Sequence, residues 1–272
     1  MDPLNSDRLF AGSIPQLYEQ YLVPLIFAPY AVDMVQRVAA LQPSRVLEIA
    51  AGTGVVTRRL TMQLPVSTSI VATDLNQPML DHAASIGTKR AVEWRQADAM
   101  QLPFADESFD VVVCQFGVMF FPDKARAYAE ARRVLRAGGR FVFNAWDAIE
   151  HNEFADTVTH ALEAPFAADP PRFLARLPHG YHDVAAISRD LALGGFRRTP
   201  DIVTVTEQSR AASPRVAAIA YCQGTPLRNE IEARSAIGLA EATDIATAAV
   251  TQRFGSGAVQ GRIQAHVFSV ER

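Results

Sequence analysis

The residues best suited to do chemistry lie in one short stretch, Val46 to Leu60, which reads V-L-E-I-A-A-G-T-G-V-V-T-R-R-L. Its first four residues have the apolar composition of a buried parallel strand. The next five include none larger than threonine, and helical spacing then resumes. A strand, a tight turn of small residues and a helix let a ligand lie against bare backbone at the carboxyl edge of a sheet. The carboxylate of Glu48, at the strand end, would face that ligand.

Two ligands compete for this turn, a dinucleotide and S-adenosylmethionine. The dinucleotide fingerprint G-x-G-x-x-G opens a helix onto a pyrophosphate. Gly52 and Gly54 are present, but Thr57 stands where the third glycine belongs. The carboxylate of Glu48 would also face an anionic pyrophosphate, whereas it suits a ligand that presents a cation such as an ammonium group. The sulfonium ligand therefore fits better.

The run Glu48-Ile49-Ala50-Ala51-Gly52-Thr53-Gly54 resembles the first motif of class I S-adenosylmethionine-dependent methyltransferases, an acidic residue followed by alternating glycines. The chain is similar to the small-molecule group that includes the ubiquinone and menaquinone biosynthesis methyltransferases, strongly over residues 40 to 147. Ala50 departs from the motif and costs one methyl group of clearance. The resemblance implies methyl transfer from S-adenosyl-L-methionine, leaving S-adenosyl-L-homocysteine, to an O, N or C atom of a small molecule.

Further cofactor residues are implied at the places that the family uses. Asp74 follows the glycine turn by about twenty residues, where a carboxylate accepts hydrogen bonds from two ribose hydroxyls. Asp98 resembles the acceptor for the adenine amine; capping and loop roles for the two aspartates stay open. Tyr18 and Tyr21 resemble residues that close over the cofactor, or they are core. The whole expected set is Glu48, Ala50, Ala51, Gly52, Gly54, Asp74, Leu75, Met79, Asp98, Ala99, Met100, Gln115, Phe116, Tyr18 and Tyr21.

Elements that position these residues alternate along the chain between Arg45 and Trp146. Such alternation predicts a parallel sheet with helices on both faces. We expect strands near 45–50, 69–74, 91–96, 110–115 and 139–145, and helices near 54–64, 77–86 and 123–136. The resemblance adds a Rossmann-like three-layer α/β sandwich with a mostly parallel seven-stranded sheet. Its last strand, near 262–270, is expected to be antiparallel and inserted between the fifth and sixth.

The remaining segments are expected to decorate one domain spanning residues 1–272. Residues 1–40 form a helical cap that three prolines, Pro15, Pro24 and Pro29, break into short pieces. Two helical lid insertions cover 148–182 and 208–255. The glycines at 138 and 139 are expected to end the helix near 123–136.

Catalytic residues are unknown from sequence, with two weak candidates. If the acceptor is a phenol or an acidic carbon, a general base helps, and His179 and His182 lie in the insertion that would cover it. Apolar residues of the same insertion suggest an apolar or aromatic acceptor pocket, or they anchor the lid to the sheet: Phe154, Phe166, Phe173, Leu174 and Leu177. No H-x-x-x-H or C-x-x-C spacing occurs, so no metal is expected.

The composition of the chain limits the classes of partner that we expect it to bind. The net charge of −3 over 272 residues provides no field that attracts nucleic acid or anionic membrane. Gln115-Phe116-Gly117-Val118 also lacks the Asn/Asp-Pro-Pro-aromatic motif of nucleic-acid amino-methylating relatives. No apolar stretch predicts stable membrane insertion, and two cysteines form no disulfide framework, so the cytoplasm is expected. A homodimer is one open alternative for the oligomeric state.

Two rival functions stay open: an NAD(P)-dependent oxidoreductase and a non-catalytic methyltransferase-like binding protein.

Overall fold

The computed structural model describes residue 10 and residues 12–272, which form two compact units. The sheet unit comprises Tyr30–Trp146, Tyr181–Val205 and Ala265–Arg272. The accessory unit comprises the described residues up to Pro29, together with Asp147–Gly180 and Thr206–Gln264. The expected cap and lid segments contribute most of the accessory unit. That they and the sheet form one domain stays a prediction.

The sheet has seven strands in the order β3-β2-β1-β4-β5-β7-β6. Strands β1 to β5 pair in parallel, and β7 pairs antiparallel with β5, so the predicted topology is confirmed. The strand order reverses between β1 and β4, which makes the carboxyl ends of these two strands the place where ligands bind in such sheets. The bounds are Arg45–Glu48 (β1), Ser69–Asp74 (β2), Glu93–Gln96 (β3), Phe109–Gln115 (β4), Leu135–Trp146 (β5), Asp201–Ala211 (β6) and Val259–Glu271 (β7).

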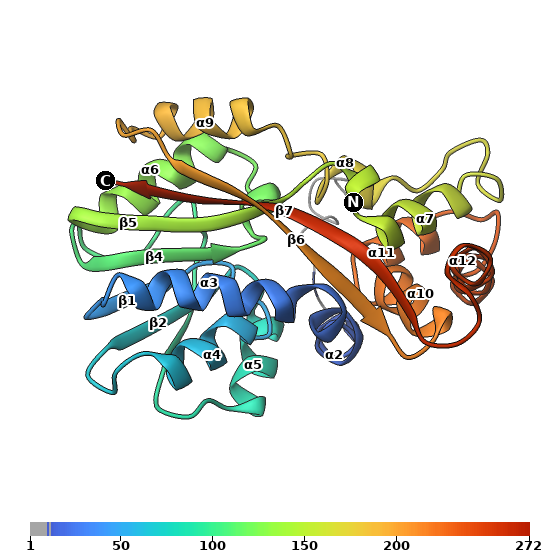
Figure 1. The fold of residues 1–272 in the computed structure, drawn as a ribbon, viewed down its shortest axis with the longest axis horizontal. Coiled ribbons are helices and arrows are strands. Elements are labelled where there is room, and N and C mark those ends of the chain that lie inside the picture. Colours follow the sequence, from blue (N-terminus) through green and yellow to red (C-terminus); the bar gives the residue numbers. More distant parts are fainter. Residues whose placement is uncertain (1–9, 11) are drawn as a thin grey trace. The chain divides into compact units, whose positions relative to one another are not determined.

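Helices cover both faces of the sheet (Figure 1). On one face lie α3 (Ala28–Ala40), α4 (Val55–Gln63) and α5 (Gln77–Ile86); on the other lie α6 (Lys124–Val134) and α9 (Val184–Leu193). The short 3-10 helix η2 (Val118–Phe120) follows β4. Valines 46, 113 and 142, from three adjacent strands, pack with residues of α3 and α4 into one buried cluster. This cluster fixes which strand side chains face α3 and α4.

The prolines near the amino terminus do not break the helix there, contrary to the sequence expectation. Helical structure runs from Ile14 to Ala40 through α2 (Ile14–Leu17), the π-helix η1 (Tyr18–Phe27) and α3. Pro15 occupies the first turn of α2, where its missing N–H would be unpaired anyway. Pro24 lies inside η1, and the helical path continues past it into α3.

The same helical run is long and apolar enough to cross a membrane by length and composition alone. Within its apolar window, 56% is buried against the rest of the chain. Buried core helices of globular proteins pass the same test, so this observation is weak evidence for a span.

Gly138 and Gly139 do not cap α6. The helix ends at Val134, and β5 begins at the next residue. Both glycines lie inside β5, close to a register shift in its pairing with β4. Gly138 has a φ of +73°, and a Cβ on Gly139 would lie 2.9 Å from two carbonyl oxygens. These two glycines therefore allow the backbone conformation of a bulge in β5.

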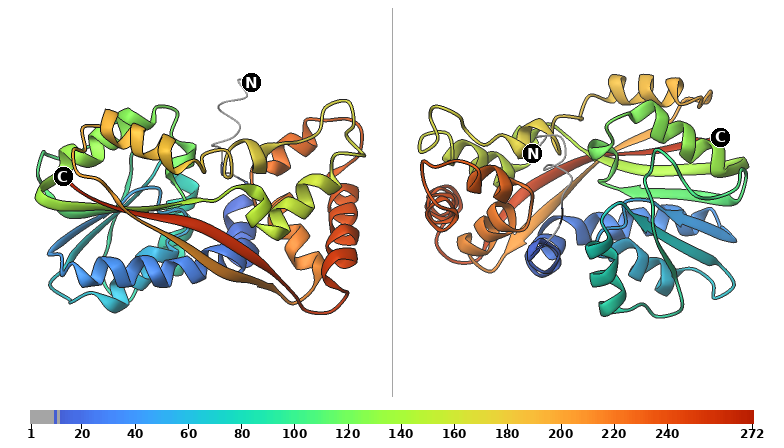
Figure 2. Two further views of the ribbon diagram at one scale, coloured as in Figure 1. Left: turned by 45° about the horizontal axis from the view of Figure 1, so that its top comes forward. Right: turned by 180° about the vertical axis from the view of Figure 1, so that it is seen from behind.

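The accessory unit is mostly helical, and its helices α7, α10 and α12 pack on one another (Figure 2). Phe154, Phe166, Phe173 and Leu174 are buried in it, and the Phe154 ring packs edge-on against Phe254 at 4.9 Å. These side chains therefore belong to the core of the accessory unit, and both an apolar acceptor pocket and anchoring of the lid to the sheet stay predictions. Its further elements are η3 (Ile149–His151), α7 (Glu153–Ala161), α8 (Phe173–Arg176), α10 (Pro214–Gln223), α11 (Leu227–Glu232) and α12 (Leu239–Phe254).

Candidate functional site

The turn between β1 and α4 adopts a conformation that demands small residues. Ala50, Gly52 and Gly54 all have positive φ, at +54°, +57° and +83°. The Ala51 amide donates to the carbonyl of Thr73 at 2.9 Å, which ties the turn to the end of β2. A Cβ on Gly54 would also lie 2.9 Å from the Trp94 ring, so only glycine fits there.

Ala50, the one departure from the glycine motif, is accommodated by Gly117 after β4. A Cβ added to Gly117 would clash with the methyl group of Ala50. The left-handed conformation costs an alanine about 1–2 kcal/mol. Space for the Ala50 methyl is therefore supplied by the missing side chain at Gly117, and the turn keeps its shape.

Asp74, at the end of β2, holds the glycine turn in place. Its side chain is 8% exposed. Oδ2 accepts a hydrogen bond from the Gly52 amide at 2.9 Å, and Oδ1 accepts one from the Asn76 amide at 2.8 Å. Burial raises the pKa of Asp74, and these amide donors oppose the rise. A carboxylate has about four acceptor positions, so further hydrogen bonds from a ligand remain possible.

Glu48 is buried beneath the turn, with 2% of its surface exposed. The Thr57 hydroxyl donates to its Oε2 at 2.5 Å. Burial raises the pKa of Glu48 to about 8, while the Thr57 hydrogen bond and the nearby charge of Arg58 act in the opposite direction. Thr57 occupies the position of the third glycine in the dinucleotide fingerprint, and in this chain its hydroxyl is a hydrogen-bond donor to Glu48.

The loop that follows β3 carries the residues expected beside an adenine. Asp98 is half-buried, and its Oδ1 accepts from the Met100 amide at 2.8 Å, which closes a tight turn. Ala99 and Met100 are also half-buried. Leu75 is 42% exposed at the end of β2, whereas Met79 is 3% exposed within α5. Leu75 is thus the more accessible apolar surface.

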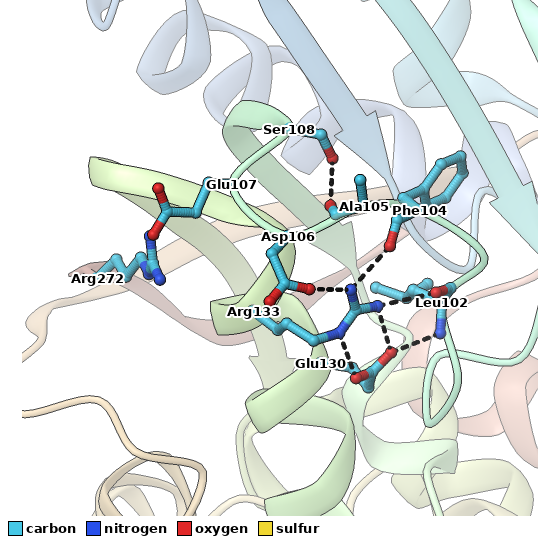
Figure 3. Close-up of polar contacts among 9 residues, drawn as sticks. All are labelled: Leu102, Phe104, Ala105, Asp106, Glu107, Ser108, Glu130, Arg133 and Arg272. Carbon is cyan, nitrogen blue, oxygen red and sulfur yellow. Dashed lines mark hydrogen bonds and ion pairs between the residues drawn. The ribbon is translucent and has the colours of Figure 1, made fainter.

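Arg133 of α6 anchors the continuation of this loop (Figure 3). Its guanidinium donates to the carbonyls of Leu102 and Phe104 at 2.9 and 2.7 Å, and to Asp106 at 2.7 Å. Two further bonds, of 2.7 and 2.8 Å, reach the carboxylate of Glu130. Arg133 thus makes three hydrogen bonds to the loop between β3 and β4, and Glu130 and Arg126 of the same helix add one each. Asp106 has a structural role.

The end of β4 forms a second unusual turn. Phe116 has a φ of +54°, and its amide donates to Oδ1 of Asn144 at 2.8 Å. Its ring stacks on Trp146 at 3.8 Å and meets Tyr30 edge-on at 5.2 Å. Sequence reasoning did not single out Asn144, Trp146 or Tyr30. The available signal was a lone amide within the apolar run of β5.

Within the sheet unit, the structure gathers the predicted residues at the carboxyl ends of β1, β2, β3 and β4. Tyr18, Tyr21 and His179 belong to the accessory unit. Tyr18 stacks on Phe27 at 5.0 Å, and the buried His179 has Nδ1 2.9 Å from the carbonyl oxygen of Asp147. His182 belongs to the sheet unit and is exposed. Functional roles for these four residues stay predictions.

Metal-binding side chains do not cluster in the described part of the chain. No group of three or more His, Cys, Asp and Glu residues there is arranged to hold an ion. Both cysteines, Cys114 and Cys222, are buried and free.

Known proteins resemble this chain over the segment that carries the turn. A family model described as "Methyltransferase domain" matches residues 47–143. Demethylmenaquinone methyltransferase from Deinococcus radiodurans is 41% identical over 105 residues, which are 38% of this chain and 43% of that protein. The ubiquinone/menaquinone biosynthesis C-methyltransferase UbiE from Stutzerimonas stutzeri is 33% identical over 138 residues, 49% of each chain. The chain thus spans less than half the length of these relatives.

A solved structure shows the same fold. Phosphoethanolamine N-methyltransferase 2 from Haemonchus contortus, in complex with phosphomonomethylethanolamine and S-adenosylhomocysteine, superposes with a TM-score of 0.60. Identity is 16%, with coverage of 98% of this chain and 59% of that one. Together these findings confirm the Rossmann-like fold and the resemblance to class I methyltransferases of the quinone-biosynthesis group.

Proposed function

We propose that this chain, whose residues 47–143 match the methyltransferase domain family, transfers a methyl group from S-adenosylmethionine to a small molecule. The observation that carries the proposal is the turn after β1. Its left-handed residues expose bare backbone at the point where the strand order reverses, and Asp74 accepts from the Gly52 amide within it. Relatives that match this segment are methyltransferases by name.

The residues present fit this cofactor. Glu48 supplies a carboxyl group for an ammonium, and Asp74 retains acceptor capacity for ribose hydroxyls. Leu75 offers exposed apolar surface for the adenine ring, and the half-buried Asp98 offers an acceptor for its amine. Ala50, Ala51, Gly52 and Gly54 would line the backbone wall, Met79, Ala99 and Met100 the adenine side, and Gln115 and Phe116 the methionine arm.

Bound S-adenosylmethionine would supply an electrophilic methyl group on a sulfonium with a good leaving thioether. The protein's contribution is then to orient and to exclude water, and orientation contributes on the order of 7–11 kcal/mol in favourable cases. Phe116, Trp146 and Tyr30 form a buried aromatic cluster beside the end of β4. This cluster would keep water away from that side of the site.

The acceptor is proposed only as a class, a small and apolar or aromatic molecule with an O, N or C nucleophile. Two named relatives act in menaquinone or ubiquinone biosynthesis, but the family match ends at residue 143. Both accessory segments after Trp146 lie outside it, so acceptor identity does not transfer. The cytoplasmic location, the homodimer and the histidine base stay proposals.

The dinucleotide alternative has no support from these relatives. Thr57 replaces the third glycine and donates to Glu48 at 2.5 Å, an interaction that a glycine could not make. A non-catalytic binding role is separated from catalysis by a turnover assay. We would incubate the protein with S-adenosylmethionine and a panel of phenols, quinols and heterocyclic amines, and measure S-adenosylhomocysteine release by mass spectrometry. Acceptor-dependent release that is lost in Asp74→Ala supports the proposal. Cofactor binding without release across the panel would favour the binding role.

A further inference from the structure

Three polar residues form a row on one face of the sheet, next to the proposed cofactor. Side chains alternate along a strand, and the valines at 46, 113 and 142 pack with α3 and α4. The residues two positions later are Glu48, Gln115 and Asn144, so they face the same side. Pairing sets Glu48 opposite Val113, and Gln115 opposite Asn144. The row therefore crosses β1, β4 and β5 at their carboxyl ends.

Asn144 is completely buried, and only one end of its amide is used. Oδ1 accepts from the Phe116 amide at 2.8 Å. Nδ2 is sealed from solvent and has no hydrogen-bond partner among the residues that the structure describes. A buried donor without a partner costs about 1–3 kcal/mol, so it requires an explanation.

The nearby glycine turn shows a second buried polar atom of the same kind. Thr53 is 1% exposed, and its Oγ1 likewise lacks a hydrogen-bond partner within the described part of the chain. Two donors in this state lie at the carboxyl edge of the sheet, and Asn144 shares a sheet face with Glu48, two strands away. Together they indicate a ligand that brings oxygen atoms. An amino-acid group carries a carboxylate and an ammonium on the same carbon atom, so a donor and a carboxyl group on one face of the same sheet edge suit its two ends.

We propose that Asn144 positions the cofactor: its Oδ1 fixes the Phe116 turn, and its Nδ2 donates to the carboxylate of the cofactor's amino-acid end. This inference rests on the proposed function, because it takes S-adenosylmethionine as the ligand. Phe116 is held in the left-handed region, which a phenylalanine rarely occupies. The hydrogen bond that Asn144 Oδ1 accepts from the Phe116 amide stabilises that conformation. Nδ2 of the same side chain would then donate to the ligand carboxylate.

Two ligands and one substitution test the donor. S-adenosylhomocysteine carries the amino-acid end, whereas methylthioadenosine keeps the adenosine and the sulfur but lacks that end. Asn144→Asp retains an oxygen for the Phe116 amide, removes the donor and places a carboxyl group against the ligand carboxylate. Calorimetric titration should show at least a tenfold loss of affinity for S-adenosylhomocysteine, and less than a twofold change for methylthioadenosine.

Controls separate this role from a general loss of stability. Thr68 is buried at the opposite, amino-terminal edge of β2, where its hydroxyl donates to the Pro43 carbonyl at 2.9 Å. Thr68→Val removes a buried hydrogen bond there and should lower the melting temperature without changing either affinity. Asn144→Ser, which is smaller and neutral, checks the binding result should Asn144→Asp fail to fold.

Equal weakening of both ligands by the Asn144 variants would overturn the inference, because it would assign Asn144 to the Phe116 turn alone. Unchanged affinity for both ligands in a folded variant would overturn it as well. A wild-type protein that binds neither ligand would instead remove the proposed function, which distinguishes the two failures.

Discussion

Glu48 makes stability and ligand binding depend on pH in a direction that the structure fixes. Burial raises its pKa to about 8 from the ordinary 4.5. Between these two values the folded protein holds a proton that the unfolded chain has released. The free energy of unfolding therefore falls as pH rises through this window, by about 1.4 kcal/mol per pH unit. Across the window the loss is on the order of 5 kcal/mol.

Glu48→Gln isolates this effect, because glutamine does not titrate and its carbonyl oxygen can still accept from the Thr57 hydroxyl. Urea denaturation at pH 5, 6.5 and 8 should show wild-type stability falling relative to the variant at each step, so that the variant is the more stable protein at pH 8. Parallel curves for the two proteins would refute the buried, protonated Glu48.

Ligand binding provides an independent measurement of the same proton. A cationic ammonium placed beside Glu48 favours its ionised form, so binding of S-adenosylhomocysteine near pH 7 should release a proton. Calorimetry in two buffers of different ionisation enthalpy measures that release. We expect it in the wild type and not in Glu48→Gln, and affinity of the wild type should rise between pH 6 and 8. Equal proton release by both proteins would place the proton on another group.

Three further predictions follow from the contacts, one of them with a matched control substitution. Asp74→Ala should weaken S-adenosylhomocysteine binding by roughly 1.5–3 kcal/mol, the worth of hydrogen bonds to a charged acceptor, and unchanged calorimetric affinity would show that Asp74 faces away from the ribose. Gly54→Ala should lower the melting temperature and abolish binding because of its φ and its contact with Trp94; Gly138→Ala, also at positive φ but with open space, should cost only about 1 kcal/mol in urea denaturation and retain binding. Arg133→Leu should cost about 1–2 kcal/mol of unfolding free energy and raise proteolysis between β3 and β4; an unchanged cleavage rate would contradict its anchoring role.

The strands and central helices were predictable because their signals are local. Apolar runs such as Val111 to Cys114 give parallel strands, and the small residues after Glu48 give the turn. The inserted antiparallel strand followed from the family resemblance. Alternation in β7 shows a strand but does not reveal its partner.

Errors arose where tertiary context overrides a local rule. Pro24 would break an α-helix, but it lies in a π-helix, whose hydrogen-bond pattern a sequence does not display. Gly138 and Gly139 have the composition of a helix cap, but they lie inside β5 at the register shift in its pairing with β4.

The candidate site was only partly visible in the sequence for a related reason. Glycines and strand-end aspartates follow a recognisable spacing, so Gly52, Gly54 and Asp74 could be predicted. Asn144 and Trp146 reach the site through sheet pairing and ring stacking with Phe116, which are long-range contacts. The charge state of Glu48 depends on burial, which the motif does not specify.

The central claim is that the turn after β1 binds S-adenosylmethionine, and a binding measurement tests it most directly. Purified protein would be titrated calorimetrically with S-adenosylhomocysteine and, in parallel, with NADH. We expect binding of S-adenosylhomocysteine and no heat with NADH. Binding of NADH alone, or of neither ligand, would contradict the claim.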